Sequence, residues 1–157
     1  MKTLILYATK YGATAEIAQR IKTRLDESVL HDLKQDNIPD ISEFDCVIIG
    51  SSLYAGAIRK EAKTFLVNHE RDLLDKSVGL FLSGLDTETS QEFFAKNFPQ
   101  ELLTAAKATC FAGGVYDPKK VGWFGRFLMK AATKLVVYTD KIDDSEIERF
   151  SEAMRLK

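Results

Sequence analysis

The feature that most constrains the fold of this chain is a regular alternation between short apolar runs and amphipathic helical patterns. Five runs have the length and composition of β-strands: residues 2–7, 28–33, 45–50, 77–82 and 108–115. Helices are predicted at 13–25, 61–74, 90–98, 101–107, 121–138 and 143–156. Strands that alternate with helices indicate βαβ units and a parallel sheet. The central runs are continuously apolar, which predicts that helices cover both faces of that sheet.

Length and composition predict one globular domain over residues 1–157. Hydrophobic residues make up 45% of the chain and charged residues 29%, a balance typical of folded globular proteins. The net charge of −1 argues against a nucleic-acid binder, because such proteins usually carry a basic surplus. The first apolar run is too short for a signal peptide, and no run reaches the roughly 18 residues of a spanning helix.

Cysteine and histidine usage indicates neither disulfides nor a metal site. Cys46 and Cys110 stand alone in apolar runs, where free thiols usually behave as small buried hydrophobic groups. His31 and His69 are isolated and have no ligand spacing around them. This pattern is compatible with a reducing compartment, so we expect a cytoplasmic location.

The loop after the first predicted strand has the composition of an anion-binding site. It consists of Thr9, Lys10, Tyr11, Gly12, Ala13 and Thr14. Backbone N–H groups at a helix start, together with the positive end of the helix dipole, favour a phosphate there. The loop lacks both the Gly-Lys-Ser/Thr ending of a P-loop and the dinucleotide pattern G-x-G-x-x-G. The alternative is that Thr9 and Thr14 only cap the helix.

The motif Thr9-x-Tyr11-Gly12-x-Thr14 resembles the phosphate loop of the flavodoxin family. Tyr11 stands where that family usually has a small hydroxyl residue. The resemblance covers nearly the whole chain and implies a flavodoxin-like α/β three-layer sandwich, with five parallel strands in the order 2-1-3-4-5 and helices on both faces. It also implies one FMN, bound non-covalently, with its phosphate on this loop.

Two further loops fall where the flavodoxin family holds the flavin ring. They contribute Ser51, Ser52, Leu53, Tyr54, Ala55 and Gly56, and then Ser83, Gly84, Leu85 and Asp86. An aromatic ring, small polar side chains and backbone amides suit a flat, amphipathic ligand. The alternatives are that Tyr54 is an exposed loop aromatic and that Asp86 caps the next helix. No residue stands out as a catalytic acid or base.

Longer segments resemble a narrower family, the flavodoxin-type protoporphyrinogen oxidases of bacteria. These segments are residues 1–18, 45–61, 111–130 and 136–140. The resemblance implies an FMN-dependent oxidoreductase that takes electrons from a porphyrinogen-like substrate, passes them to a quinone and contributes to haem synthesis. Compared with those relatives, the chain is short after Ser83 and between Lys130 and Val137.

Three other functions stay open: a small electron carrier between redox proteins, a general FMN-dependent quinone reductase and a non-redox regulatory module. Carrier flavodoxins are strongly acidic, and their charge steers them to basic partners. The net charge of −1 therefore favours an enzyme over a carrier.

Residues 115–141 form a basic segment with interleaved apolar side chains. Its cations are Lys119, Lys120, Arg126, Lys130, Lys134 and Lys141, against Asp117 and Asp140. Helical spacing predicts that an apolar stripe packs on the sheet, made of Phe124, Phe127, Leu128, Ala131 and Leu135. Trp123 lies outside that stripe. Beside Lys119 and Lys120, it is a candidate for peripheral contact with a membrane or for docking a partner protein.

Overall fold

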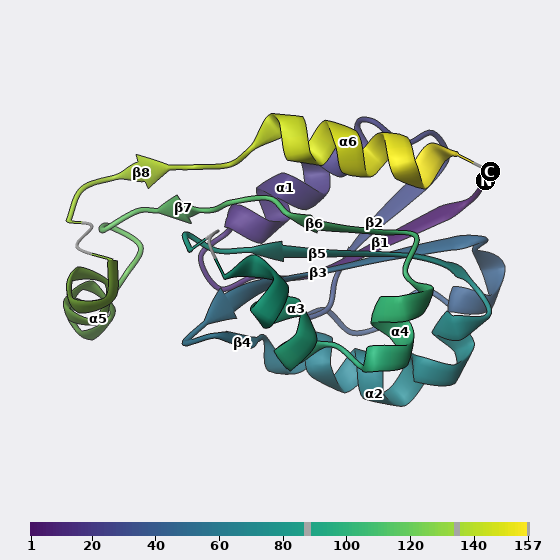
Figure 1. Cartoon of the computed structure of the whole chain (residues 1–157), viewed down its shortest axis with the longest axis horizontal. Coiled ribbons are helices and arrows are strands. Elements are labelled where there is room, and N and C mark those ends of the chain that lie inside the picture. The colour runs from purple at the N-terminus through teal and green to yellow at the C-terminus, as the bar shows by residue number, and fades with distance from the viewer. Residues whose placement is uncertain (87–88, 134–135, 157) are drawn as a thin grey trace.

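A parallel β-sheet with the expected strand order forms the centre of the structure (Figure 1). The computed structural model describes residues 1–86, 89–133 and 136–156. The parallel strands are β1 (Thr3–Ala8), β2 (Ser28–Asp32), β3 (Cys46–Tyr54), β5 (Ser77–Ser83) and β6 (Ala108–Phe111). Their order is β2-β1-β3-β5-β6, which confirms the flavodoxin-like topology. A short strand, β4 (Ala57–Ile58), pairs antiparallel with β3 and was not expected.

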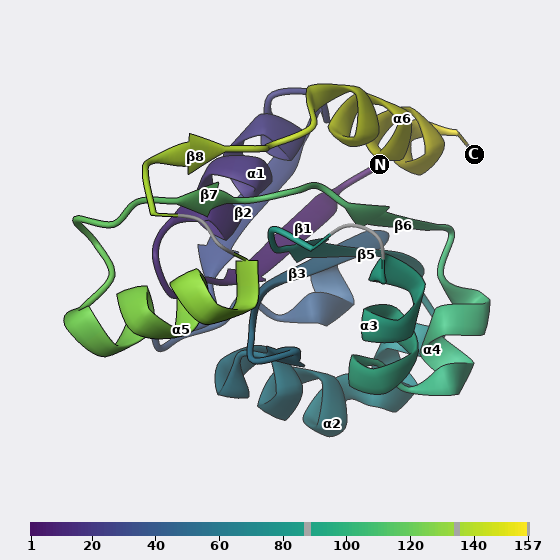
Figure 2. The same ribbon diagram turned by 60° about the vertical axis from the view of Figure 1, so that its left-hand side comes forward.

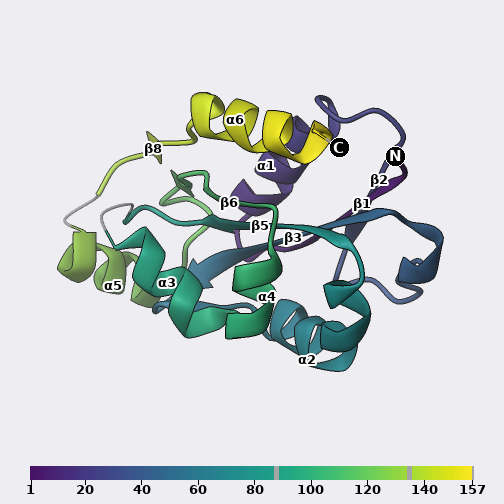
Figure 3. The same cartoon turned by 45° about the vertical axis from the view of Figure 1, so that its right-hand side comes forward.

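Helices cover both faces of the sheet, which confirms the three layers (Figures 1 and 3). One face carries α1 (Ala13–Lys22) and α6 (Asp144–Arg155), and the other carries α2 (Lys60–Leu74), α3 (Ser90–Asn97) and α4 (Gln100–Ala105). A 3-10 helix, Ile41–Glu43, precedes β3. Successive strand residues serve opposite cores, since Leu4 packs with the α2 face and Ile5 with the α1 face. Burial on both sides explains why the strands are continuously apolar.

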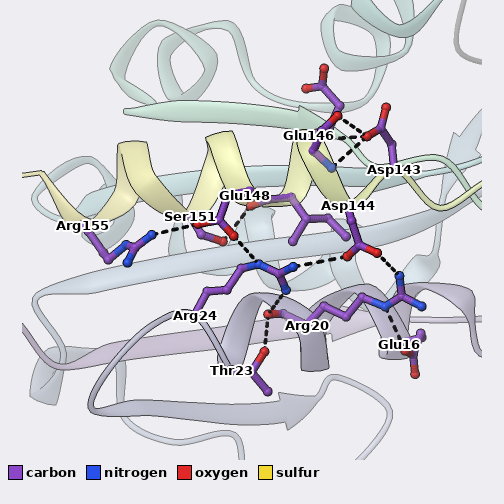
Figure 4. Close-up of polar contacts among 12 residues, drawn as sticks. Glu16, Arg20, Thr23, Arg24, Asp143, Asp144, Glu146, Glu148, Ser151 and Arg155 are labelled. Carbon is purple, nitrogen blue, oxygen red and sulfur yellow. Dashed lines mark hydrogen bonds and ion pairs between the residues drawn. The ribbon is translucent and has the colours of Figure 1, made fainter.

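Ion pairs join α1 and the turn that follows it to α6 (Figure 4). Arg20 donates to Asp144 at 2.8 Å, and Arg24 donates to Glu148 at 2.7 Å. The Asp143 carboxylate caps α6 by accepting from two backbone amides of its first turn. Partly exposed pairs of this kind contribute at most about 1 kcal/mol each, so their main effect is to fix the position of α6 beside α1.

The apolar run at 108–115 is divided between two sheets. β6 ends at Phe111, and β7 (Val115–Tyr116) pairs antiparallel with β8 (Thr139–Asp140). Gly113 has a φ of 73°, and a Cβ atom there would lie 1.8 Å from the carbonyl oxygen of Lys141. The segment after β6 and the residue that follows β8, Lys141, can therefore approach this closely only because residue 113 is a glycine.

The stretch 121–138 is not one helix. It contains α5 (Trp123–Thr133), while 136–138 are not helical. α5 lies beyond the end of the sheet, whereas α1 and α6 cover one of its faces (Figures 1 and 2). No helix in the described ranges is long and apolar enough to cross a membrane. Phe124 and Phe127 are 55% and 65% exposed, so the expected core stripe is wrong. Ala131 is exposed too, whereas the Leu128 side chain and Leu135 lie outside the described residues.

Candidate functional site

A cavity of about 370 Å³ lies at the carboxyl ends of β1, β3 and β5. All three loops selected from the sequence contribute to its wall. The expected residues that line it are Thr9, Lys10, Tyr11, Ala13, Ser52, Leu53, Tyr54, Ala55, Gly56, Ser83, Gly84, Leu85 and Asp86. Parallel strands end at the same edge of a sheet, so loops distant in sequence meet there.

The first loop forms a tight turn in front of α1. The Thr9 hydroxyl accepts a hydrogen bond from the Gly12 amide at 2.9 Å. Gly12 has a φ of 101°, a conformation that favours glycine. Neither Thr9 nor Thr14 caps α1, which begins at Ala13 without a side-chain cap. Because Ala13 lines the cavity, the positive end of the α1 dipole lies at its wall.

Three expected site residues do not line the cavity: Gly12, Thr14 and Ser51. The buried Thr14 hydroxyl lies 2.7 Å from the Ser83 hydroxyl, with which it shares a hydrogen bond. The Ser51 hydroxyl accepts from the Arg59 amide at 2.9 Å and donates to the Ser52 carbonyl at 3.1 Å. The polar groups of Thr14 and Ser51 are thus used inside the protein, where they connect the loops to one another.

Tyr54 lies at the tip of the β3–β4 hairpin, against the side chain of Lys10. Lys10 Nζ is 3.1 Å from the centre of the Tyr54 ring and 5.2 Å from the centre of the Tyr11 ring. A cation held over aromatic faces is attracted by their π electrons. Tyr54 is 38% exposed, as the alternative of an exposed loop aromatic predicts. It also lines the cavity, as expected for a residue of the site.

Ser52 presents a buried hydroxyl oxygen that forms no hydrogen bond with any residue the structure describes. The residue lines the cavity. A buried polar atom without a partner costs free energy, and such atoms in native proteins usually mark a ligand or water position. The Ser52 hydroxyl is therefore suited to a polar atom of a bound molecule.

The third loop is held against the segment that follows β6. The Gly84 amide donates to the Gly113 carbonyl at 3.0 Å. Asp86 lines the cavity, and its carboxylate accepts from the Thr89 hydroxyl at 3.2 Å. The N-cap of α3 is Thr89, so the alternative in which Asp86 caps this helix is wrong.

Part of the cavity wall was not expected from the sequence. The additional lining residues are Phe93, Phe111, Gly114, Val115, Tyr116, Val121, Gly125 and Met129. Phe93 and Phe111 stack with ring centres 6.2 Å apart. Val121, Gly125 and Met129 follow one another at four-residue intervals, the spacing of one helical face. That spacing is visible in the sequence, but nothing in the sequence says that this face turns toward the cavity.

The titratable groups with the most perturbed environments lie away from the cavity. Burial raises the pKa of the Cys110 thiol to about 12 and raises the pKa of Cys46 as well. Both thiols are in the core, as expected from their apolar neighbours. Within the described ranges, no three His, Cys, Asp or Glu residues gather in a way that could hold a metal ion. The cavity is chiefly apolar, with Lys10 and Asp86 as charged groups on its described wall.

Comparisons with known proteins agree with this architecture. One relative is protoporphyrinogen IX dehydrogenase [quinone] of Escherichia coli (strain K12), 26% identical over 89% of this chain and 88% of that protein. The solved structure of oxidised Flavodoxin 2 from Bacillus cereus matches with a TM-score of 0.55 and 28% identity, covering 98% of this chain and 97% of that one. A flavoprotein in complex with FMN from Lactobacillus acidophilus NCFM matches with a TM-score of 0.51 and 19% identity, over 71% and 90%. The model of the Flavodoxin domain family matches residues 4–143, and the chain therefore belongs to that family.

Proposed function

We propose that this chain binds FMN non-covalently in the cavity and acts as an oxidoreductase. The observation that carries the proposal is the convergence of three flavodoxin-like loops on one cavity. In this proposal the phosphate binds at residues 9–14, and the flavin ring lies between residues 51–56 and 83–86. Family membership and the FMN complex of the L. acidophilus flavoprotein support it.

The residues of the cavity fit this cofactor. The N-terminus of α1 and the Lys10 ammonium group offer positive charge to a phosphate. The unpaired Ser52 hydroxyl suits a polar edge of the ring. Apolar side chains such as Leu53 and Leu85 suit its flat faces.

FMN supplies the redox chemistry when it is bound, because it takes up and releases electrons. The protein provides binding, orientation and a surrounding charge. Tyr54 offers an aromatic face for stacking. Leu53 and Met129 add apolar side chains to the wall, which would limit the access of water to a bound ring. Lys10 places a positive charge at the wall, which favours negative charge on a bound molecule.

We further infer that the electron donor is a porphyrinogen-like compound and that a quinone is the acceptor. In the overall reaction the porphyrinogen loses hydrogen and the quinone gains it. Similarity to the E. coli protoporphyrinogen IX dehydrogenase over most of both chains supports this substrate class. The net charge of −1 also supports an enzyme, since a carrier would benefit from a stronger acidic charge.

An anaerobic assay tests the reaction. The protein is loaded with FMN, and protoporphyrinogen is added with and without menaquinone while flavin absorbance and porphyrin fluorescence are followed. We expect the porphyrinogen to bleach the flavin and the quinone to sustain turnover above a flavin-free control. Tight FMN binding without any acceleration would contradict the substrate assignment but not the cofactor assignment.

Variants at the ring site test the cofactor assignment separately. Tyr54→Ala should weaken FMN binding about tenfold, because an aromatic contact is worth about 0.5–1.5 kcal/mol beyond the area it buries. Tyr138→Ala is the matched control, since Tyr138 is 60% exposed and does not line the cavity. Equal FMN affinity of the two variants, measured by fluorescence quenching, would refute the proposed ring position.

A carrier of electrons between proteins is the second candidate. It is favoured by the 28% identity to Flavodoxin 2 of B. cereus over nearly the full length of both chains. A carrier would hold single electrons stably during stepwise reduction and would not reduce quinone. The anaerobic assay therefore separates the two functions.

A further inference from the structure

One wall of the cavity is formed by the short β3–β4 hairpin. Strand β4 has only two residues, and the turn before it places Ala55 and Gly56 at positive φ, 50° and 74°. A positive φ suits glycine but costs alanine free energy. Tyr54, Ala55 and Gly56 all line the cavity. Because a two-stranded hairpin is only marginally stable by itself, contacts from another element decide where this wall stands.

Asn97, the last residue of α3, supplies those contacts. Its side-chain oxygen accepts a hydrogen bond from the Ile58 amide at 2.9 Å, and its side-chain nitrogen donates to the Gly56 carbonyl at 3.0 Å. The same nitrogen donates to the Phe93 carbonyl at 2.8 Å. Ile58 offers a donor, whereas Gly56 and Phe93 offer acceptors. A side chain at this position therefore has to accept and donate at once, as an amide does.

The helix that carries Asn97 is fixed on the core. Phe94 and Phe98 are buried on the α2 side of the sheet and stack with ring centres 5.7 Å apart. Phe93, one turn before Asn97, lines the cavity and stacks on Phe111 of β6. α3 lies beside β4 (Figure 1). A well-anchored element thus brings Asn97 to the hairpin.

We propose that Asn97 is a positioning residue for the flavin ring, an inference that rests on the proposed function. The ring would lie between residues 51–56 and 83–86, and α3 follows the second of these loops in the chain. Asn97 connects the hairpin wall to that helix and so fixes where Tyr54 stands. Without the amide, the hairpin opens more often, and fewer molecules hold Tyr54 where it can stack.

Asn97 acts through the backbone rather than by contact with the ligand. Its side chain is not part of the described wall of the cavity, whereas Gly56, to which it donates, lines that wall. Tyr54 pairs across the hairpin with Ala57, which lies between Gly56 and Ile58. A displacement of Gly56 and Ile58 therefore also displaces Tyr54. It follows that the loss of Asn97 matters to FMN chiefly while the Tyr54 ring is present.

A double-mutant cycle on the purified full chain tests this dependence, with FMN affinity measured by fluorescence quenching. Asn97→Leu removes the three hydrogen bonds and should weaken FMN binding about tenfold, because a smaller fraction of molecules has the hairpin in place. In a Tyr54→Ala background the same substitution should weaken it about threefold at most. Asn68→Leu, at an exposed position of α2, is the matched control and should leave the affinity unchanged. Single effects that multiply in the double variant, to about a hundredfold, overturn the proposal.

Two readouts separate positioning from a general loss of structure. Without FMN, the amides of residues 55–58 should exchange hydrogen faster in Asn97→Leu than in the original chain, while those of β1 and β5 exchange as before. At saturating FMN, the bound flavin of the variant should fluoresce more strongly, because it stacks less on tyrosine. Asn97→Ala is the second variant if leucine disturbs folding. Faster exchange throughout the sheet, or a flavin quenched as fully as in the original chain, overturns the proposal.

The same measurements distinguish this inference from the proposed function. An original chain that takes up no FMN contradicts both. FMN binding that Asn97→Leu weakens no more than Asn68→Leu contradicts the positioning role alone. The cycle uses neither porphyrinogen nor quinone, so its result does not depend on the substrate assignment.

Discussion

Substitution of Gly113 by alanine should destabilise the protein by about 3 kcal/mol, for two reasons that the structure separates. The φ of 73° costs a non-glycine residue about 1 kcal/mol. The new Cβ would also lie 1.8 Å from the backbone oxygen of Lys141, and no side-chain rotation relieves that contact. The β8 segment must therefore move away from the segment that follows β6.

That movement strains two backbone hydrogen bonds. The Lys141 amide donates to the Gly114 carbonyl at 2.9 Å, and the Asp143 amide donates to the Ala112 carbonyl at 3.0 Å. Each of these hydrogen bonds contributes about 1 kcal/mol to stability. Together with the cost of the positive φ, their loss accounts for the expected destabilisation of about 3 kcal/mol. Because Gly114 lines the cavity, the same change should also weaken FMN binding.

Urea unfolding followed by circular dichroism measures the effect. Gly122→Ala is the matched control in the same segment, since its φ is not positive and a Cβ atom there would meet nothing within 4 Å. The control should stay within about 0.5 kcal/mol of the original chain, as surface substitutions usually do. A Gly113→Ala variant as stable as the control would refute the steric argument.

Three further predictions concern the core, a buried hydroxyl pair and a helix cap. Gly50→Ala should cost about 2 kcal/mol in urea unfolding, because the added Cβ would lie 1.9 Å from the ring of the fully buried Phe81; an unchanged midpoint would contradict it. Thr14→Val should cost about 1–2 kcal/mol by leaving the buried Ser83 hydroxyl unpaired, and adding Ser83→Ala should recover part of that loss. A serine hydroxyl and backbone amides at the start of α6 lower the pKa of Asp143, so its stabilisation is present above the ordinary carboxyl pKa and disappears as pH falls through the lowered one. Asp143→Ala should therefore cost about 1 kcal/mol at neutral pH and progressively less in acid, and a difference independent of pH would exclude this cause.

The parallel sheet could be predicted because its strands are buried on both faces. The continuous apolar composition of β3 and β5 identifies them without any knowledge of their neighbours. Their order came from the resemblance of the loop containing Thr9 and Gly12 to a family phosphate loop, not from the strands themselves. The same resemblance identified the loops at the carboxyl ends, and those loops line the cavity.

The orientation of α5 could not be predicted, because helical periodicity shows that one face is apolar but not what covers it. Phe124 and Phe127 have the spacing of core residues and are nevertheless exposed. Val121 and Met129 line the cavity although they follow β6 and the positive φ of Gly113, at a place that no sequence pattern indicates. Hydrophobic periodicity relates only residues that are close in sequence, so it cannot predict a contact between Gly113 and Lys141.

The position of α6 affects how the protein is synthesised. Phe150 and Met154 cover Gly79 of β5 so closely that a Cβ atom there would lie 2.8 Å from the phenylalanine ring and 2.9 Å from the methionine sulfur. α6 follows all five parallel strands in the chain, so the part of the sheet face that α6 covers stays open while the ribosome is still translating them. During that interval Phe81 lacks its ring contact with Phe150, and uncovered apolar surface of this kind favours aggregation and chaperone binding of a nascent chain.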